Sequence, residues 1–245
     1  MINLKIAIQK SGRLNEDSLT LLKECGISIN NGKDQLMAQA SNFRLDVLYL
    51  RNSDIPQYVR DGVADIAIIG DNTEKEKKTG IRHVLDLGFS RCRLSIAVPK
   101  NVDFQDISYL QGKKIATSYP NSLKDFLTEN DIEAEIHEIS GSVEIAPNIG
   151  LTDAICDLVS SGSTLFKNGL KEVYKIFESQ AILVANSGLC GEKQELLAQL
   201  VFRIKAVLAA KYNKYILLNA PEKALDRICR LLPGMKSPTI MPLRE

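Results

Sequence analysis

A segment near the middle of the chain, residues 150–165, combines acidic, hydroxyl and glycine residues in one short stretch. Its apolar residues recur with a helical period, and Thr152 is a suitable N-cap, so we expect a helix that begins there. Helical spacing places Asp153 and Asp157 four residues apart on one face, where like charges destabilise a helix by about 0.2–0.5 kcal/mol. A sequence that accepts such a local cost is a candidate functional site.

A turn rich in serine and glycine follows this segment directly. Gly162 lets backbone N–H groups approach a ligand closely, and hydroxyl side chains on either side add donors. Thr164 can begin the next helix, whose N-terminus attracts phosphate. Carboxylates for sugar hydroxyls beside such a turn would form a ribose-phosphate site, whereas the alternative is an ordinary polar turn between two helices. The candidate residues of the turn are Ser160, Ser161, Gly162, Ser163 and Thr164.

The N-terminal third of the chain supplies a second group of candidates, each placed directly after an expected strand. Apolar patterns predict strands near residues 4–8, 45–50 and 64–69, with helices between them, which is the order of a parallel sheet. Ligands of open parallel sheets bind at the carboxyl ends of the strands. Two cationic ends and one acidic end therefore favour a crevice for a multiply charged anion, with or without a metal; the alternative is loop polarity. The residues at these ends are Lys10 to Arg13, Arg51 to Ser53, and Gly70 to Asn72.

The second half of the chain continues the alternation of strands and helices. Strands are expected over residues 114–117, 135–139 and 172–185, and a helix is expected to follow Tyr119. Residues 192–210 have the apolar spacing of a strongly amphipathic helix. The sequence therefore predicts an α/β protein in which further loops lie at strand ends.

Composition excludes several classes of protein. The chain has 245 residues, of which 44% are hydrophobic and 25% charged, and its formal net charge is +1, so it lacks the basic excess of a nucleic-acid binder. It contains no apolar run of bilayer length and no secretion signal at its start. The five cysteines include no CxxC pair and there are only two histidines, so neither a disulfide framework nor a zinc ribbon is indicated. A cytoplasmic protein with reduced thiols is expected.

Familiar nucleotide and hydrolase signatures are missing, since the sequence contains no GxxxxGK[ST], GxGxxG or GxSxG. Five blocks nevertheless resemble, in family order, the ATP phosphoribosyltransferases, over about residues 4 to 243. Any single block is weak, but five in order are specific. They are residues 7–14 (AIQKSGRL), 51–56 (RNSDIP), 65–70 (DIAIIG), 92–99 (CRLSIAVP) and the 153–165 segment, which resembles the family's phosphoribosyl pyrophosphate loop.

The resemblance implies the first step of histidine biosynthesis. In that reaction adenine N1 of ATP attacks C1 of phosphoribosyl pyrophosphate, giving phosphoribosyl-ATP and pyrophosphate with Mg²⁺ required. The implied fold is α/β, a two-lobed catalytic core like the type II periplasmic binding proteins. By this analogy residues 1–98 and 184–213 form one catalytic lobe, residues 99–183 form the other, and both substrates bind in the cleft.

Residue roles follow from the same resemblance. Asp153 and Asp157 would accept hydrogen bonds from the ribose hydroxyls, directly or through Mg²⁺, and the Ser160–Thr164 backbone would bind the 5-phosphate. Arg13 and Arg51, from the opposite lobe, would stabilise the departing pyrophosphate. The remaining expectations are Lys10 for a phosphate, Asp71 for Mg²⁺ or the nucleotide, and Tyr119 against the purine, unless Tyr119 is an ordinary surface tyrosine. Arg93 could equally form a structural ion pair.

The C-terminal region departs from both family forms. A strand from Tyr215 to Asn219, a helix after Pro221 and a strand from Pro238 to Leu243 are expected, which resembles an incomplete βαβ half of the long form's regulatory domain, residues 214–245. About 30 residues cannot bury enough apolar surface to fold alone. Histidine feedback is therefore an open question. The resemblance implies a homo-oligomer, a dimer or a hexamer, with no nucleic-acid or membrane partner.

Two other functions fit a two-lobed architecture. One is a small-ligand-binding module without catalysis; the missing export signal and the Asp/Ser/Gly/Thr segment favour an enzyme over it. The other is an inactive regulatory paralogue, which would be expected to have lost the phosphate loop that is present here. Release of pyrophosphate from ATP and phosphoribosyl pyrophosphate discriminates among the three.

Overall fold

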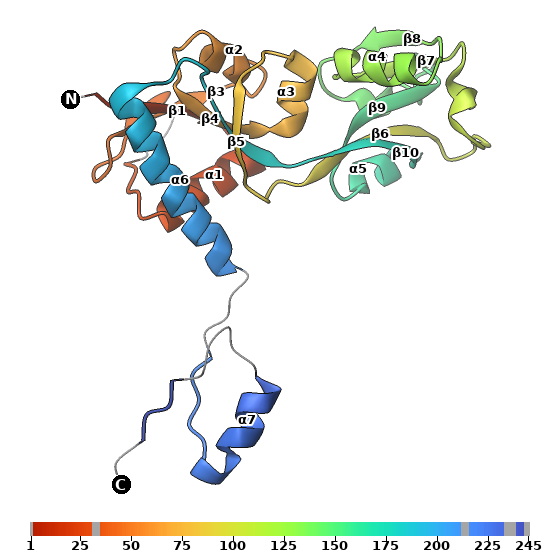
Figure 1. Cartoon of the computed structure of the whole chain (residues 1–245). Helices are drawn as coiled ribbons and strands as arrows, with labels where there is room; N and C mark the ends of the chain where they lie inside the picture. Colours follow the sequence, from red (N-terminus) through yellow and green to blue (C-terminus); the bar gives the residue numbers. More distant parts are fainter. Residues whose placement is uncertain (1, 31–34, 212–215, 233–238, 243–245) are drawn as a thin grey trace. The chain divides into compact units, whose positions relative to one another are not determined.

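The computed structural model describes residues 2–30, 35–211, 216–232 and 239–242. The chain divides into two compact units, residues 1–208 and 209–245, and each is described here by itself. The first unit contains two β-sheets with helices packed on their faces (Figure 1). We call the first sheet with its helices the first lobe, and the second sheet with its helices the second lobe.

The first lobe is built on a six-stranded sheet in the order β2-β3-β1-β4-β11-β5. Strands β3, β1 and β4 are parallel neighbours, as the alternation of strands and helices predicts. Their carboxyl ends therefore share one edge of the sheet, which confirms that the three predicted loops lie together. The strands are β1 (Leu4–Gln9), β2 (Met37–Gln39), β3 (Leu45–Leu50), β4 (Ile66–Gly70), β5 (Arg82–Asp86) and β11 (Ala181–Ala185).

Both faces of the first sheet are covered, which explains the nearly continuous apolar sequences of its central strands. Helices α1 (Arg13–Glu24) and α6 (Gly191–Lys211) bury leucines such as Leu21 and Leu200 on one face. Helix α2 (Ile55–Arg60) buries Ile55 and Val59 on the other face, and its proline lies in the first turn. Helix α3 (Asp71–Lys77) begins directly after β4. The helices predicted between the first three strands and over residues 192–210 are confirmed.

The second lobe is built on a five-stranded mixed sheet in the order β10-β6-β9-β7-β8. Strands β9, β7 and β8 are parallel, while β6 runs antiparallel to both β9 and β10. One face buries α4 and a 3-10 turn, η1, and the other buries α5 and a second 3-10 turn, η2. These elements are β6 (Cys92–Pro99), η1 (Ile107–Leu110), β7 (Lys114–Thr117), α4 (Pro120–Glu129), β8 (Glu135–Glu138), η2 (Val143–Ile145), β9 (Ala154–Val159), α5 (Ser163–Lys167) and β10 (Leu170–Ser179).

The chain passes between the two sheets twice. It leaves the first sheet after β5 and enters the second at β6, then returns between β10 and β11. The single strand expected over residues 172–185 is therefore two strands, separated at Gln180, that belong to different sheets. The expected domain boundaries at residues 98 and 184 stay predictions; the crossings themselves lie at residues 86–92 and 179–181.

The helix expected over residues 153–159 is wrong, because Ala154 to Val159 form strand β9. The stretch buries alternate residues against both faces of the second sheet, so its apolar positions satisfy a buried strand as well as a helical period. A six-residue run is the length of a strand rather than of a helix. Asp153 and Asp157 consequently lie at different ends of β9, not on one turn of a helix.

The second unit contains a helical segment, η3 (Glu222–Ala224) followed by α7 (Leu225–Leu231), which confirms the predicted helix after Pro221. Residues 216–219 and 239–242 form no strand, whereas the sequence predicts one at each place. A strand needs a neighbouring strand to satisfy its backbone groups, and the described residues of this unit supply none. Tyr215, Pro238 and Leu243 lie outside the described residues.

Candidate functional site

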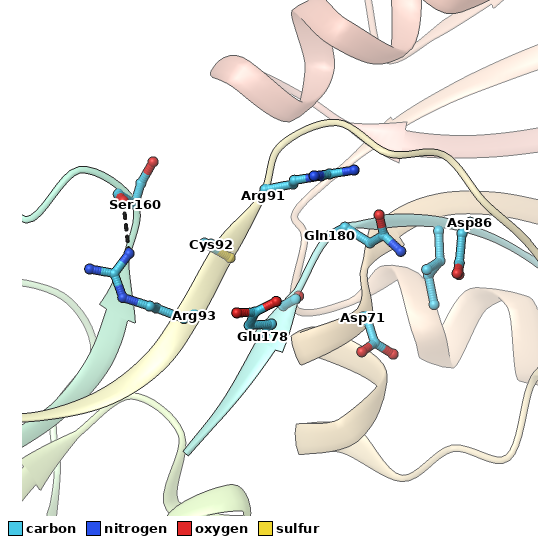
Figure 2. Close-up of a pocket in the computed structure, with 10 residues that line it drawn as sticks. Asp71, Asp86, Arg91, Cys92, Arg93, Ser160, Glu178 and Gln180 are labelled. Atoms are coloured by element: carbon cyan, nitrogen blue, oxygen red, sulfur yellow. Dashed lines mark hydrogen bonds between the residues drawn. The ribbon is translucent and has the colours of Figure 1, made fainter. Parts of the chain in front are cut away.

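Strand ends of the two lobes meet at their junction, because Arg13 after β1 contacts Ser160 after β9, and Asn72 after β4 contacts Tyr119 after β7. A cavity of about 600 Å³ lies at this junction, beside the two chain crossings. Ser160 and Arg93 lie at one end of it, and Asp71, Gln180 and Asp86 lie at the other (Figure 2). The residues lining it are Asp71, Asp86, Arg91, Cys92, Arg93, Ser160, Glu178, Ser179, Gln180 and Ile182.

Arg13 is the first residue of α1 and reaches from the first lobe to the second. Gly12, at φ 87°, makes the tight turn that places Arg13 directly beyond the carboxyl end of β1. The Arg13 guanidinium donates to Oγ of Ser160 at 3.3 Å, and its Nε lies 3.9 Å from Asp17. The side chain remains 61% exposed, so its cationic donors are available to an anion in the cleft.

The other expected residues of the first lobe lie on the same edge of the sheet. Lys10 continues the β1–β3 ladder through its backbone N–H, and Arg51 directly follows β3; both are exposed. Asp71 begins α3, lines the cavity, and forms an ion pair of 2.6 Å with Lys75. The structure thus brings these three residues and Arg13 to one edge of the sheet.

The Ser160–Thr164 loop follows β9 and turns into α5 at Gly162. Gly162 has φ 78°, a left-handed conformation that glycine adopts without strain. The Ser161 hydroxyl donates to the Ser163 hydroxyl at 3.0 Å and accepts the backbone N–H of Ser163 at 3.4 Å. Ser160, Ser161, Ser163 and Thr164 are all exposed, and Ser160 also lines the cavity.

Arg93 holds the start of this loop. Its guanidinium makes a two-pronged ion pair with Glu172 across the β6–β10 ladder, and its Nη1 donates to the carbonyl of Ser160 at 3.2 Å (Figure 2). Ser95 also donates to Glu172, at 2.8 Å. The hydrogen bond from Arg93 lowers the pKa of Glu172, which keeps the carboxylate ionised. Arg93 is therefore both a structural ion-pair residue and a support of the loop.

Asp157 lies near the carboxyl end of β9, three residues before the loop. It is half-buried, and one carboxylate oxygen accepts the backbone N–H of Leu158 at 2.8 Å. Burial raises the pKa of Asp157 to about 6, more than that hydrogen bond lowers it. A carboxylate with such a shift, three residues before a residue that lines the cavity, is a candidate functional group.

Asp153 is not brought to the loop. It precedes β9 at the amino end of the strand, and its carboxylate accepts the backbone N–H of Lys114 at 2.9 Å. The six residues of β9, each rising about 3.3 Å, separate it from Ser160. The structure therefore speaks against the expected ribose contact of Asp153.

Tyr119 joins the two lobes and is only partly exposed. Its ring packs against the core of the second sheet, and its hydroxyl accepts a hydrogen bond of 3.5 Å from Asn72 at the start of α3. Burial raises the pKa of the Tyr119 hydroxyl, and the nearby Asp157 carboxylate raises it further. This placement fits a contact between the lobes better than the expected stacking on a purine.

The two carboxylates expected to hold a metal, Asp71 and Asp157, come from opposite lobes. Among the described residues, no group of three or more His, Cys, Asp or Glu side chains converges as a metal site. Mg²⁺ is commonly bound by one or two carboxylates together with substrate phosphates, so a complete protein cage is not needed. Asp71 fits that arrangement, because it lines the cavity and is only partly buried.

Several cavity residues have no counterpart in the sequence analysis. Arg91, Cys92, Glu178 and Gln180 all lie where the chain passes between the sheets. In the sequence these residues are marked only by lying between two strands of different lobes. That position can be recognised only when it is known which strand belongs to which sheet. Asp86, at the end of β5, was missed for the same reason.

No helix in the described part of the chain is long and apolar enough to cross a membrane.

Comparison with known families gives two matches. The family model described as ATP phosphoribosyltransferase matches residues 51–206, and the model described as HisG, C-terminal domain, matches residues 210–245. The ATP phosphoribosyltransferase of Cytophaga hutchinsonii is 58% identical over 242 residues, which covers 99% of this chain and 85% of that relative. The enzyme of the same name from Phocaeicola vulgatus is 53% identical, covering 99% of this chain and 86% of the relative.

Solved structures give the same picture of the fold. A chain of the ATP phosphoribosyl transferase (HisG:HisZ) complex from Thermotoga maritima matches with a TM-score of 0.73 at 29% identity, covering 84% of this chain and 99% of that one. A substrate-binding protein of an amino acid ABC transporter matches with a TM-score of 0.57 at 12% identity, covering 86% and 95%. The second likeness concerns the fold alone and confirms the expected resemblance to periplasmic binding proteins.

Proposed function

Since this chain belongs to the ATP phosphoribosyltransferase family, which carries out the first step of histidine biosynthesis, we propose that the cleft between its two lobes is where ATP and phosphoribosyl pyrophosphate react. Adenine N1 of ATP forms a bond to C1 of phosphoribosyl pyrophosphate, and the bond from C1 to the pyrophosphate oxygen breaks. The products are phosphoribosyl-ATP and pyrophosphate. Each lobe supplies one part of the site.

The second lobe holds the phosphoribosyl group. The Ser160–Thr164 loop binds the 5-phosphate through its hydroxyls and backbone N–H groups, because the left-handed Gly162 leaves room for a ligand to approach the backbone. Arg93 fixes the start of the loop through the Ser160 carbonyl. Asp157, when ionised, accepts a hydrogen bond from a ribose hydroxyl. This role explains why the sequence keeps a carboxylate at a position where burial disfavours its charged form.

The first lobe stabilises the leaving group. Arg13 and Arg51, at the carboxyl ends of β1 and β3, donate to the pyrophosphate as negative charge develops on it, and Lys10 lies on the same edge. Adenine N1 carries a lone pair and needs no deprotonation to attack. Catalysis then consists of positioning and charge stabilisation, and no side chain acts as a general base.

We further propose a metal ion, a cellular compartment and an oligomeric state for the reaction. Mg²⁺ would be held by substrate phosphates with Asp71 as the candidate protein ligand, and it would neutralise phosphate charge. The substrates are cytoplasmic metabolites, so we place the reaction in the cytoplasm. A homo-oligomer, dimeric or hexameric, is proposed from the family alone.

The observation that carries this proposal is the 3.3 Å contact between Arg13 and Ser160, which brings the cationic edge of one lobe against the Ser160–Thr164 loop of the other. The test is an assay of pyrophosphate release from ATP, phosphoribosyl pyrophosphate and Mg²⁺. Release that requires all three supports the proposal. Binding of phosphoribosyl pyrophosphate without release would instead indicate a ligand-binding module.

A further inference from the structure

A buried carboxylate of the first lobe caps a helix of the second. Glu76, in the last turn of α3, is 6% exposed. Its Oε1 accepts the backbone N–H of Asn121 at 2.9 Å, and its Oε2 accepts the backbone N–H and the hydroxyl of Ser122 at 2.9 and 2.8 Å. Both of these residues belong to the first turn of α4. The Glu76 carbonyl also accepts the Asn121 side-chain amide at 3.0 Å.

These contacts complete the N-terminus of α4, which has no cap of its own. The N-cap residue, Tyr119, makes no side-chain capping hydrogen bond. The first helical residue, Pro120, has no N–H, and the N–H of Leu123 already donates to the Tyr119 carbonyl. Only the amides of Asn121 and Ser122 remain without intrahelical partners, and Glu76 accepts both. A negative side chain at this end of a helix also complements the helix dipole.

Separation of the lobes at this point would exchange three hydrogen bonds to a carboxylate, which are stronger than those between neutral groups, for hydrogen bonds to water. Two neighbouring contacts reinforce the junction, since Lys78 forms an ion pair of 2.6 Å with Asp125 and Asn72 donates to Tyr119. Glu76 thus holds helix α3 of the first lobe to helix α4 of the second. Helix α3 begins at Asp71, and α4 follows β7, the strand that pairs with β9. Strand β9 leads directly into the Ser160–Thr164 loop.

We propose that Glu76 is a positioning residue: by capping α4 from the opposite lobe it forms a fixed junction that keeps the arginine edge of the first lobe aligned with the Ser160–Thr164 loop. This inference rests on the proposed function, because alignment matters only if both lobes act on one substrate. Glu76 lies outside the residues that would touch substrate. It would act on turnover through geometry, and a misplacement of about 1 Å can cost about a hundredfold in rate.

Glu76→Gln is the informative variant and Glu74→Gln is its matched control. Glutamine replaces one acceptor oxygen with a donor that faces the donors of α4, so the junction weakens while the side-chain shape is kept. Glu74 lies on the same helix, but its carboxylate accepts from Thr79 and Gly80 within the first lobe. We expect kcat for pyrophosphate release to fall about ten- to a hundredfold in E76Q and to change by no more than about twofold in E74Q. Binding of ribose 5-phosphate, which would use the second lobe alone, should stay unchanged in both.

Amide hydrogen exchange resolved to single residues tests the junction without any activity. In the wild-type protein the amides of Asn121 and Ser122 should exchange slowly, and they should remain slow when ATP and phosphoribosyl pyrophosphate are added. Both amides should exchange faster in E76Q. If E76Q does not fold, Ser122→Ala takes its place, because it removes one of the three hydrogen bonds to the Glu76 carboxylate, and it should raise the exchange rate of the amide at position 122.

Two results would overturn the inference. One is exchange of Asn121 and Ser122 in the wild type as fast as that of exposed loop amides, which would mean that the junction does not hold. The other is an equal fall in Tm for E76Q and E74Q with kcat unchanged in both, which would leave Glu76 a purely structural role. Failure of the proposed function is distinguishable, because it would appear as a wild-type protein that releases no pyrophosphate whatever its exchange pattern.

Discussion

The guanidinium of Arg13 lies 3.3 Å from the Ser160 hydroxyl although the two residues are 147 positions apart in the chain. Arg13 begins a helix of the first lobe, and Ser160 begins the Ser160–Thr164 loop of the second. The pair therefore marks the point at which a bound anion could contact both lobes at once. A phosphoribosyl pyrophosphate molecule, with a phosphate at one end and a pyrophosphate at the other, matches that requirement.

Arg13→Ala should lower kcat by about a hundredfold, because removal of one donor to a developing charge typically costs that much. Steady-state assays of pyrophosphate release measure the effect. The Tm should hardly change, since the side chain is 61% exposed and its ion pair with Asp17 is a surface pair. Lys23→Ala, which removes a cation from the other end of the same helix, is the control and should leave kcat near the wild-type value. Equal kcat in R13A and the wild type would remove Arg13 from the mechanism.

Gly162→Ala should weaken binding of phosphoribosyl pyrophosphate by about tenfold or more, because a left-handed alanine costs about 1–2 kcal/mol and relaxation of the turn would move the loop's backbone donors. Calorimetric titration gives the dissociation constant. Gly169→Ala is a matched control: Gly169 has φ 68°, and an added Cβ would meet no atom within 4 Å. The control should lose a similar amount of stability with its affinity intact. Equal affinities in the two variants would contradict the role of the loop.

Asp157→Asn should stabilise the ligand-free protein while it weakens binding of phosphoribosyl pyrophosphate. The pKa of Asp157 is raised from 3.8 to about 6, so folding favours the protonated form and the ionised carboxylate costs stability. The cost is absent below pH about 4, grows as the pH rises to about 6 and is then constant, on the order of 3 kcal/mol. Denaturant unfolding from pH 4 to 8 should therefore show a difference between variant and wild type that increases with pH.

The control for this experiment is Asp153→Asn, at the other end of the same strand. Its carboxylate accepts the backbone N–H of Lys114, so its loss should not stabilise the protein at any pH. A difference between Asp157→Asn and the wild type that does not vary with pH would contradict the assignment of the shifted pKa. Wild-type affinity of Asp157→Asn for phosphoribosyl pyrophosphate would contradict its contact with the ribose.

Glu172→Gln should raise the KM for phosphoribosyl pyrophosphate by about tenfold and leave the KM for ATP nearly unchanged. The reason is that Glu172 orients Arg93, which in turn holds the Ser160 carbonyl, whereas neither residue lies on the first lobe. Initial-rate kinetics with each substrate varied in turn separate the two constants. Arg93→Lys should behave alike, because lysine cannot reproduce the two-pronged pair. A parallel rise in both KM values would indicate a general loss of structure instead.

Local patterns in the sequence were sufficient to predict the three parallel strands at the centre of the first sheet, but not β2, β5 or the separate strand β11. Apolar runs near residues 4–8, 45–50 and 64–69, interrupted by helical segments, required parallel strands, and the structure confirms that their carboxyl ends share an edge. The position of Arg13, Arg51 and Asp71 on that edge followed directly. The helix expected over residues 153–159 failed because the stretch is buried on both faces, so its apolar spacing does not discriminate a strand from a helix.

Contacts between the lobes could not be predicted from sequence patterns. Glu76 reads as one of several charges on a short polar helix, and nothing near it in the chain indicates that its carboxylate is buried against residues 121 and 122. The same holds for Arg93, whose partner Glu172 lies on the neighbouring strand β10 but opposite Ala97 in the strand register, so that strand pairing alone does not predict the ion pair. Such pairings depend on the assembled sheets and appear only in the structure.

If one substrate spans both lobes, a crystal structure of the protein soaked with phosphoribosyl pyrophosphate and Mg²⁺ will show it in contact with each. We expect the 5-phosphate to lie within hydrogen-bonding distance of the Ser160–Thr164 loop and the pyrophosphate to contact Arg13 or Arg51. A molecule bound with its pyrophosphate on the loop and its 5-phosphate away from it, or bound outside the cleft, would show that the two lobes do not share the substrate in this way.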